Sequence, residues 1–331
     1  MISKKLPTLI YAYLALLAAT AIWGVALPVM KLTLADIPVY AFLFFRFLLV
    51  CIIVLPYLIF ELKNNPIDKR DLTNLTILGL LGQSSLILIF LGINFTTAID
   101  TAIISVIAPI ITIAAGYYFY KEKINKGLEV GIIFATVGTL FIVVEPILMD
   151  LSGDISHTTA GTRIIGNLLV ILYNISFAAY IILSKRVMGD ETKELRKTFR
   201  ILDLNPLKKA YPPFVHVAFS FYIALLTVIP FFVLESFGVF GPNRFNYSML
   251  SARPLIGIVY MALISSLAAY FLFEWGLKRA RVSDTALFGY LGPLFTIPSA
   301  FLLISEIPSI LSLIGTAIIV IGVIIAEKNK S

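Results

Sequence analysis

The stretch GINFTTAIDTA at Gly92–Ala102 recurs in outline as GLKRARVSDTA at Gly276–Ala286, which puts Asp100 and Asp284 184 residues apart (284 − 100). At the same offset, without a gap, further positions are identical: Pro109 and Pro293, Thr112 and Thr296, Ile113 and Ile297, Glu122 and Glu306, Gly131 and Gly315, and Gly138 and Gly322. Each copy predicts an apolar helix with a proline inside it, a tight turn that carries a glutamate, and a second apolar helix. Two copies indicate a duplicated membrane unit and not a solenoid.

The composition requires lipid as the surrounding medium. Hydrophobic residues make up 59% of the 331, charged residues 14%, and the mean hydropathy is +0.96, whereas soluble domains average about 25% charged residues. Runs of about 20 apolar residues recur, and each matches the thickness of a bilayer. The sequence therefore predicts an all-α integral membrane protein in a lipid bilayer. Cys51 is the single cysteine, so a disulfide within the chain is excluded.

Ten membrane spans are predicted, five in each half of the chain. They cover approximately residues 8–31, 39–60, 72–93, 97–120 and 126–144, and then 163–185, 213–234, 255–277, 282–304 and 308–326. We expect a first five-helix repeat at 1–145, an external connector at 146–162, and a second repeat at 163–331. The second repeat contains an inserted loop at 188–211 with one possible short helix at 191–202. We interpret this loop as a solvated linker, with a regulatory role as the alternative.

The lysines and arginines predict the orientation. With a cytoplasmic amino terminus, 21 of the 26 lie on the cytoplasmic side and Arg46 lies within a span. The opposite side has only Lys31, Arg163, Arg244 and Arg253. Cytoplasmic loops carry the excess of these residues, so both termini are predicted to be cytoplasmic in a multi-pass protein of the cell (plasma or inner) membrane. The net charge of +7 is explained in the same way, by loop lysines and arginines that set the topology. We therefore infer no anionic partner from it, and no nucleic-acid partner is predicted.

An odd number of spans in each half makes the second copy enter the membrane from the opposite face. The charges agree, because the turn at 94–99 has no lysine or arginine while its counterpart has three. The prediction is therefore two inverted five-helix repeats. Inverted repeats are typical of alternating-access transporters, in which the two halves exchange conformations around one central site.

The same residues resemble a known family. Trp23-Gly24, Arg46-Phe47, Ala108-Pro109 and Lys121-Glu122-Lys123, with Gly292-Pro293 and Ser305-Glu306 in the second half, are similar to the EamA-like branch of the drug/metabolite transporter superfamily. The resemblance spans essentially the whole chain. It implies a permease, often an exporter, of a metabolite or drug, with a cavity between the halves. Phe177-Ala178 in place of a second Trp-Gly, and the loop at 188–211, depart from the family pattern.

Charged residues within or next to the spans need partners, because lipid cannot solvate them. Arg46 has two readings: an anion or carboxylate contact in the cavity, or a structural pair that fixes packing. Asp100 and Asp284 each start a helix, which favours N-capping. The glutamates Glu122 and Glu306 precede the fifth and tenth spans, and we interpret them as structural caps too.

Glu274 and the two repeated prolines are the remaining polar or helix-breaking candidates. Glu274 is either a proton-coupling carboxylate or, as we favour, a partner of Lys278 four residues on. Pro109 and Pro293 each remove a backbone hydrogen bond in the membrane, so we expect kinks there that are candidate hinges.

The substrate cavity is expected near the bilayer midplane, between the halves. Its candidate residues are polar or amphipathic groups in otherwise apolar spans: Trp23, Arg46, Gln83, Tyr173, Asn174, Tyr270, Glu274 and Tyr290. One arginine and one acid among aromatic rings suit a small zwitterionic metabolite better than a polyanion, which needs several cations. Tyrosine and tryptophan are also common as packing residues and in the belts at the membrane surface. A packing or interfacial role for the aromatic candidates therefore stays open as the alternative.

The leading functional prediction is therefore export of an amino acid or related small metabolite, with proton or ion coupling as an option and a monomer or homodimer as the assembly. A sugar-phosphate or nucleotide-sugar carrier is the alternative within transport. An intramembrane enzyme or a structural membrane protein is the alternative outside it. No catalytic residue, metal ligand or cofactor is predicted, because the catalytic and metal motifs HExxH, GxSxG and CxxC are missing, and the two histidines, His157 and His216, fall in or near different loops.

Overall fold

The described part of the chain divides into two compact units. The computed structural model describes residues 5–123, 126–127, 129–134, 136–138, 141, 160–201, 204, 206–241 and 244–328. Unit 1 comprises Met1–Ala19, Leu32–Ile87 and Ala179–Ala280; unit 2 comprises Thr20–Lys31, Leu88–Ala178 and Arg281–Ser331. Each unit thus takes helices from both predicted repeats, so the units are not the repeats themselves.

The helices confirm the predicted membrane protein. Their bounds are α1 Lys5–Leu34, α2 Val39–Asn64, α3 Leu72–Gly79, η1 Leu80–Ser84, α4 Leu86–Phe95, α5 Ala98–Ile104, α6 Ile107–Tyr120, α8 Ala160–Val187, α9 Lys193–Ile201, α10 Pro213–Ser236, α11 Ala252–Val259, η3 Tyr260–Ala268, α12 Ala269–Arg279, α13 Val282–Gly289, α14 Gly292–Ile304 and α15 Ile310–Lys328. Among the described residues, eight helical stretches are long and apolar enough to span a bilayer, and two shorter apolar helices are Glu129–Gly138 and Ile310–Gly322. The rest of the fifth span and most of the connector at 146–162 lie outside the described residues.

The polarity of the molecule is arranged for lipid. Leu302 is 78% exposed and Ile256 is 70% exposed, whereas Arg46 and Glu274 are buried, at 1% and 0%. A protein in water would expose the charged groups and bury the apolar ones. Burial of the charged side chains is expected only where the outer face meets hydrocarbon and the polar groups find partners inside.

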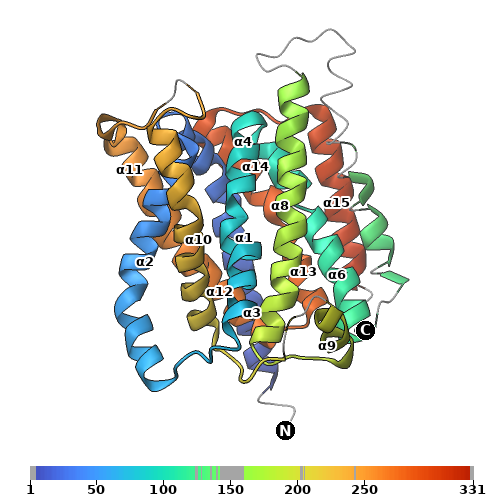
Figure 1. Cartoon of the computed structure of the whole chain (residues 1–331). Coiled ribbons are helices and arrows are strands. Elements are labelled where there is room, and N and C mark those ends of the chain that lie inside the picture. The colour runs from blue at the N-terminus through green and yellow to red at the C-terminus, as the bar shows by residue number, and fades with distance from the viewer. Residues whose placement is uncertain are drawn as a thin grey trace. The chain divides into compact units, whose positions relative to one another are not determined.

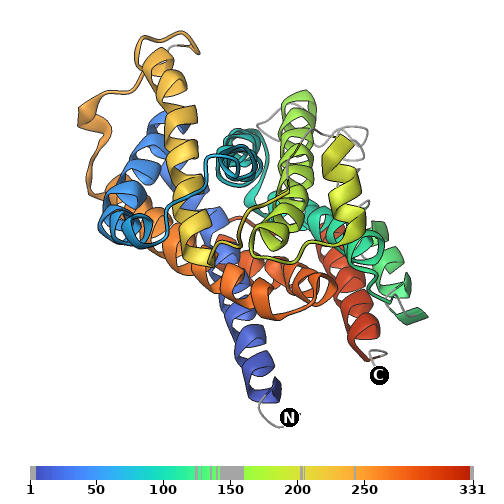
Figure 2. The same cartoon turned by 60° about the horizontal axis from the view of Figure 1, so that its bottom comes forward.

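In unit 1, α2 and α10 run side by side (Figures 1 and 2). Phe44 stacks on Phe232 with ring centroids 4.3 Å apart and planes 4° from parallel. Glu235, near the end of α10, accepts hydrogen bonds from the backbone N–H groups of Tyr40 (3.0 Å) and Ala41 (2.7 Å). Pro38, the N-cap residue of α2, offers no side-chain cap, so the distant glutamate satisfies amides that the helix start leaves open.

The inserted loop at 188–211 contains a helix, α9, which confirms the predicted short helix. Leu195 of α9 is buried, and the guanidinium of Arg186 lies 4.6 Å from the ring centroid of Phe199. Arg186 also donates to Glu191 (2.8 Å) and to Asn74 (2.8 Å) at the start of the third span. Within unit 1, the loop is therefore anchored to the third span through a buried arginine.

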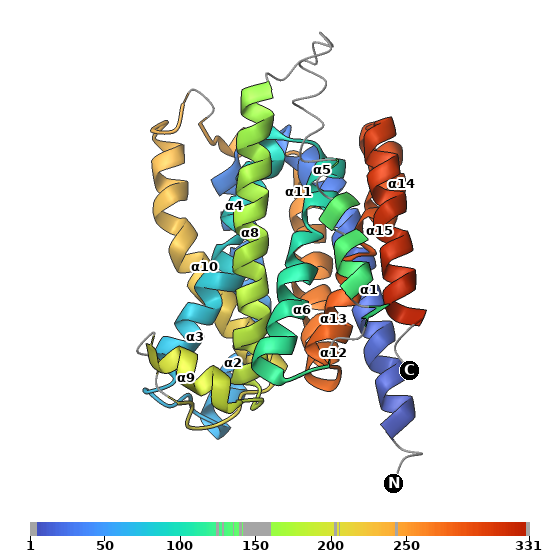
Figure 3. The ribbon, with the colours of Figure 1, turned by 90° about the vertical axis from the view of Figure 1, so that its right-hand side faces the viewer.

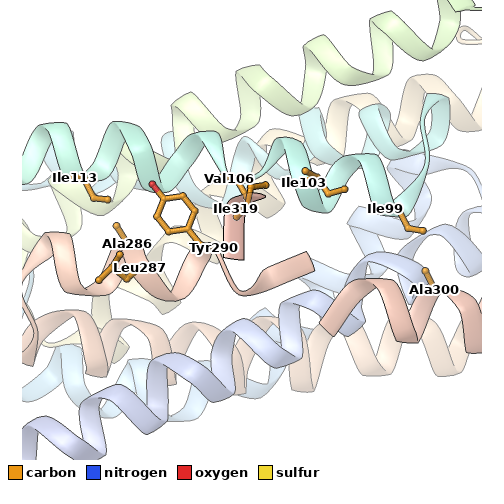
Figure 4. Packing of buried hydrophobic residues seen from close by; sticks show 9 residues of the cluster. All are labelled: Ile99, Ile103, Val106, Ile113, Ala286, Leu287, Tyr290, Ala300 and Ile319. Carbon is orange, nitrogen blue, oxygen red and sulfur yellow. The ribbon is translucent and has the colours of Figure 1, made fainter. Parts of the chain in front are cut away.

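Unit 2 is built on two helix pairs. α6 packs on α13 (Figure 3), and α5 packs on α14 and α15. Figure 4 shows the apolar cluster that these helices share. Its buried members are Ile99, Ile103, Val106, Ile113, Ala286, Leu287, Tyr290, Ala300 and Ile319.

The two glutamate turns of the repeat cap each other's helices. Glu122 accepts hydrogen bonds from the N–H groups of Val282 (2.8 Å) and Ser283 (2.9 Å), the first two residues of α13. Glu306 accepts them from the first two N–H groups of α5 (3.2 and 2.8 Å). The capping role was predicted correctly, but the predicted target was wrong, because each glutamate caps a helix of the other repeat and not the helix that follows it.

The backbone of the two turns is equivalent too. Lys121 and Ser305, one residue before each glutamate, adopt the left-handed conformation with φ of 54° and 53°. Such angles are uncommon for residues other than glycine. They occur here at two positions that are 184 residues apart, so the backbone conformation of the turns supports the repeat.

Both repeated prolines follow a break in their helix. α5 ends at Ile104 and α6 begins at Ile107, so Pro109 is the third residue of α6. Pro293 is the second residue of α14. A proline in the first turn lacks an N–H that has no intrahelical partner there in any case. The predicted interruption is therefore present, whereas movement about it remains a prediction.

Neither repeat aspartate occupies the N-cap position of its helix, contrary to the prediction; in α13 that position is Arg281. Thr97 is the N-cap residue of α5, and its side chain accepts from the N–H of Asp100. The carboxylate of Asp100 binds the guanidinium of Arg163 at 2.7 Å, and Asp284 binds Arg281 at 3.0 Å. Both aspartates lie in the first turn of their helices, where the helix dipole favours a negative charge.

Candidate functional site

A cluster of buried polar side chains lies around Glu274 in unit 1. Ser184 donates a hydrogen bond of 2.6 Å to Oε2 of Glu274. His216 Nε2 lies 3.5 Å from the same oxygen, and both side chains are 0% exposed. Tyr180, one helical turn before Ser184, is also fully buried. We call Tyr180, Ser184, His216, Tyr270 and Glu274 the Glu274 cluster.

Helical spacing brings these groups to one place. Tyr180 and Ser184 on α8 are four residues apart, as are Tyr270 and Glu274 on α12, so each pair shares one face of its helix. His216 comes from the first turn of α10. Three helices thus each turn a polar face inward.

Aromatic rings pack against one another within the Glu274 cluster, and Glu274 itself is 0% exposed. The ring of Tyr270 meets Tyr180 edge-on at 6.3 Å and 83°, and it meets Phe221 at 5.8 Å and 84°. Edge-to-face contacts of this kind favour a fixed ring orientation. Glu274 therefore lies in a water-poor surrounding, where a charge is costly unless it is paired or protonated.

Arg46 is held by a serine of a π-helical segment. Its Nε donates a 2.9 Å hydrogen bond to Oγ of Ser266 in η3, and its guanidinium lies 5.8 Å from the ring centroid of Phe47. A π-helical turn is rare and is frequent at functional sites. The contact with Ser266 supports the structural reading of Arg46 without excluding the functional one.

Gln83 lies in the other π-helical segment, η1, and is 0% exposed. Among the described residues, neither its amide nitrogen nor its amide oxygen has a hydrogen-bond partner. The preceding residue, Gly82, packs on Tyr180, since a Cβ at position 82 would lie 2.4 Å from that ring. η1 is thus adjacent to the Glu274 cluster. A buried amide without a partner is a candidate contact for a polar ligand.

The other four predicted cavity residues belong to unit 2. Phe177 packs between Trp23, edge-on at 5.8 Å and 86°, and Tyr173, stacked at 5.8 Å and 19°. Asn174 donates to the backbone oxygen of Val170 at 2.7 Å. These contacts account for the packing of Trp23, Tyr173 and Asn174.

Tyr290 has a different environment from the other candidates. It lies among the apolar side chains of the unit 2 cluster and is 2% exposed (Figure 4). Among the described residues its hydroxyl has no hydrogen-bond partner.

Three members of the Glu274 cluster were missed by the sequence analysis. His216 was assigned to the neighbourhood of a loop, but it is the fourth residue of α10 and fully buried. Tyr180 and Ser184 were overlooked, although their spacing of four residues on an apolar helix was a usable signal. The favoured pairing of Glu274 with Lys278 is replaced by the contact with Ser184.

Among the described residues, no group of three or more His, Cys, Asp or Glu side chains could hold a metal ion. A small apolar hollow in unit 1 includes none of the predicted cavity residues; it is lined by Val54, Phe214, Val217, Ala218, Leu267 and Phe271.

Known proteins share this architecture. The sequence model of the EamA-like transporter family matches residues 10–144 and 206–327. The uncharacterized transporter YetK of Bacillus subtilis is 24% identical over 322 residues, covering 96% of this chain and 87% of the relative. An uncharacterized transporter of Archaeoglobus fulgidus is 24% identical over 317 residues, covering 95% and 97%. A solved crystal structure superposes with a TM-score of 0.59 at 15% identity, covering 96% and 98%, which supports the fold alone.

Proposed function

This chain belongs to the EamA-like transporter family, and we propose that it exports an amino acid or related small metabolite across the cell membrane by alternating access. The observation that carries the proposal is the exchange of caps between Glu122 and Glu306, which makes the two repeats equivalent at single contacts. Equivalent, inverted halves can exchange conformations. The transporter relatives favour a carrier over an intramembrane enzyme or a structural protein.

The proposed substrate follows from the polar groups of unit 1. Arg46 supplies a cation suited to a carboxylate, Glu274 in its ionised form supplies an anion suited to an ammonium group, and Gln83 supplies an amide. A zwitterion would neutralise both charges on binding. A sugar phosphate, the alternative substrate, carries more negative charge than one arginine balances.

We place the remaining candidates in supporting roles. Tyr270 is proposed to contribute aromatic lining in unit 1; in unit 2 the proposed lining residues are Trp23, Tyr173, Asn174 and Tyr290. Pro109 and Pro293 are proposed as hinges, because each follows an interrupted helix. We propose repeat boundaries at 1–145 and 163–331, and either a monomer or a homodimer as the working assembly.

Transport in proteoliposomes tests the function. The full-length protein, reconstituted into lipid vesicles, is expected to take up radiolabelled amino acids from a mixed panel faster than vesicles without protein. Competition by unlabelled sugar phosphates, in place of amino acids, would instead favour the alternative substrate class.

Arg46→Gln tests the site. We expect its half-saturation concentration to rise about tenfold, since a lost charge-assisted contact costs about 1.4 kcal/mol or more. Arg244→Gln, at an exposed arginine, is the matched control. If Arg46→Gln folds normally and keeps both the rate and the half-saturation concentration, the arginine is structural and the proposed site is wrong.

A further inference from the structure

Two titratable side chains face each other inside unit 1. His216 on α10 and Glu274 on α12 are both 0% exposed, and their nearest nitrogen and oxygen are 3.5 Å apart. At that separation, and away from water, the charge on one side chain strongly affects the charge on the other. Neither ring nitrogen of His216 has a hydrogen-bond partner among the described residues. The imidazole is thus held by packing, with Nε2 close to the carboxylate.

The neighbouring lysines make their direct contacts with other groups and keep their charge. Lys185, next to Ser184 on α8, donates to the backbone oxygens of Leu277 (3.2 Å) and Ala280 (2.5 Å). Lys278, one turn beyond Glu274, is exposed and acts on His216 only through its electric field.

The remaining polar groups considered in unit 1 hold no proton that they could exchange with Glu274 near neutral pH. Arg46 stays protonated and donates to Ser266. Tyr180, Ser184, Tyr270 and Gln83 are neutral. His216 is therefore the group placed to share a proton with Glu274.

We propose that Glu274 and His216 together form a proton-binding site that couples the carrier to proton movement; the coupling rests on the transport function proposed above, whereas the binding site does not. With one proton the pair has no net charge, whether the proton is on the carboxylate or on the imidazole. When that proton leaves for water, the pair carries one negative charge. Because an unbalanced charge is costly in a sealed apolar interior, the proton leaves only when water reaches the pair.

This arrangement gives a physical basis for coupling. A conformation that seals unit 1 from water favours the protonated pair, and a conformation that opens it permits release. If the two conformations open to opposite faces, one proton crosses for each cycle. Ser184, which donates to Glu274 at 2.6 Å, is a positioning residue, because it fixes the carboxylate that faces the imidazole.

The binding site is tested by nitrogen NMR of histidine-labelled protein. The chain has only two histidines, so His157→Gln leaves His216 as the single signal. We expect this signal to change with pH, and Glu274→Gln to shift the midpoint of the change. A His216 signal that is constant over the stable pH range, or that is unaffected by Glu274→Gln, would overturn the proposal. Glu61→Gln, at a carboxylate remote from His216 in sequence, is the control and should leave the midpoint in place.

The coupling is tested with a pH-sensitive dye inside proteoliposomes that take up a radiolabelled amino-acid mixture. We expect label uptake to be accompanied by a dye response in the wild type, and Ser184→Ala to reduce the protons moved per labelled molecule. Label uptake without any proton movement would overturn the coupling and leave the transport function standing. If no label moves, the proposed substrate class is wrong, and the NMR titration alone decides the proton site.

Discussion

Glu122 and Glu306 each bind the first two backbone N–H groups of a helix that belongs to the other repeat. This exchange links α6 to α13 at one turn and α14 to α5 at the other. The cap of each helix is therefore supplied from about 160 to 208 residues away in the sequence. Unit 2 consequently holds its two central helix pairs together by side chains as well as by apolar packing.

Removing one of these caps should destabilise the fold. Glu122→Ala leaves two helix-start amides without their acceptor, so we expect a loss of about 1–3 kcal/mol in the free energy of unfolding. Glu306→Ala should cost a similar amount, because its contacts are equivalent. Thermal unfolding in detergent measures both. Glu61→Ala is the control, since that partly exposed carboxylate accepts from the side-chain amide of Asn65; equal stability of all three variants would contradict the capping role.

Gly82 should not tolerate a methyl group. A Cβ there would lie 2.4 Å from the ring of Tyr180, which is fully buried and has little room to move. We expect Gly82→Ala to lower stability by about 1–3 kcal/mol, and a second change, Tyr180→Leu, to recover part of the loss. Gly161→Ala is the matched control, because no atom lies within 4 Å of its added Cβ. If both alanine variants unfold at the same temperature, the close contact is not present in the protein.

Tyr211 should make stability depend on alkaline pH. Burial, together with the hydrogen bond to Asp71, raises the pKa of Tyr211 from 10.0 to about 12. Because the folded-state pKa lies above the unfolded one, the stability that this group contributes is fully present below about pH 10 and is lost as the pH rises to about 12. Tyr211→Phe should lack that part of the decline in unfolding temperature. Tyr247→Phe, at a tyrosine that is 76% exposed, should decline like the wild type.

Cysteine labelling should settle the topology. Cys51 is buried, and Cys51→Ser gives a background without reactive thiols. In that background we expect Arg200→Cys to react with an impermeant reagent only from the cytoplasmic side, and Arg253→Cys only from outside. Both positions are exposed, so each serves as the other's control. Reaction of position 200 from outside would reverse the proposed orientation.

The spans and the repeat were predictable because lipid imposes strong rules on a sequence. Each long apolar run had to form a helix, because only a helix satisfies its own backbone groups in lipid. The break before Pro109 was predictable because proline has no backbone N–H to donate within a helix. The alternation of loop charges gave the inversion. These features are read from local composition, which does not depend on how the helices are assembled.

The contacts between helices were not predictable in the same way. A span that is apolar all round does not show which face packs inward, so the meeting of Ser184, His216 and Glu274 could not be deduced. Nor does the sequence mark the π-helical segments η1 and η3. The target of Glu122 was missed because local reasoning assigns a capping residue to the nearest helix.

The same repeat relates two lysines at the ends of the first and sixth spans. Lys31 donates to the backbone oxygen of Thr96 within unit 2, and Lys185 donates to that of Ala280 within unit 1. Thr96 and Ala280 are 184 residues apart. Each lysine thus satisfies a carbonyl at the end of the corresponding helix, and inheritance from a duplicated ancestor accounts for both.

The edge-on contact of Trp23 with Phe177 has a consequence for the history of the chain. These residues hold corresponding positions in the two repeats, and they touch each other. In a symmetric dimer, only a side chain beside the two-fold axis meets its own copy. In an assembly of two identical copies, one mutation at this position would change both sides of the contact at once. In a single chain each side can vary separately, and the pairing of an indole with a phenyl ring is an asymmetry that two identical subunits cannot encode.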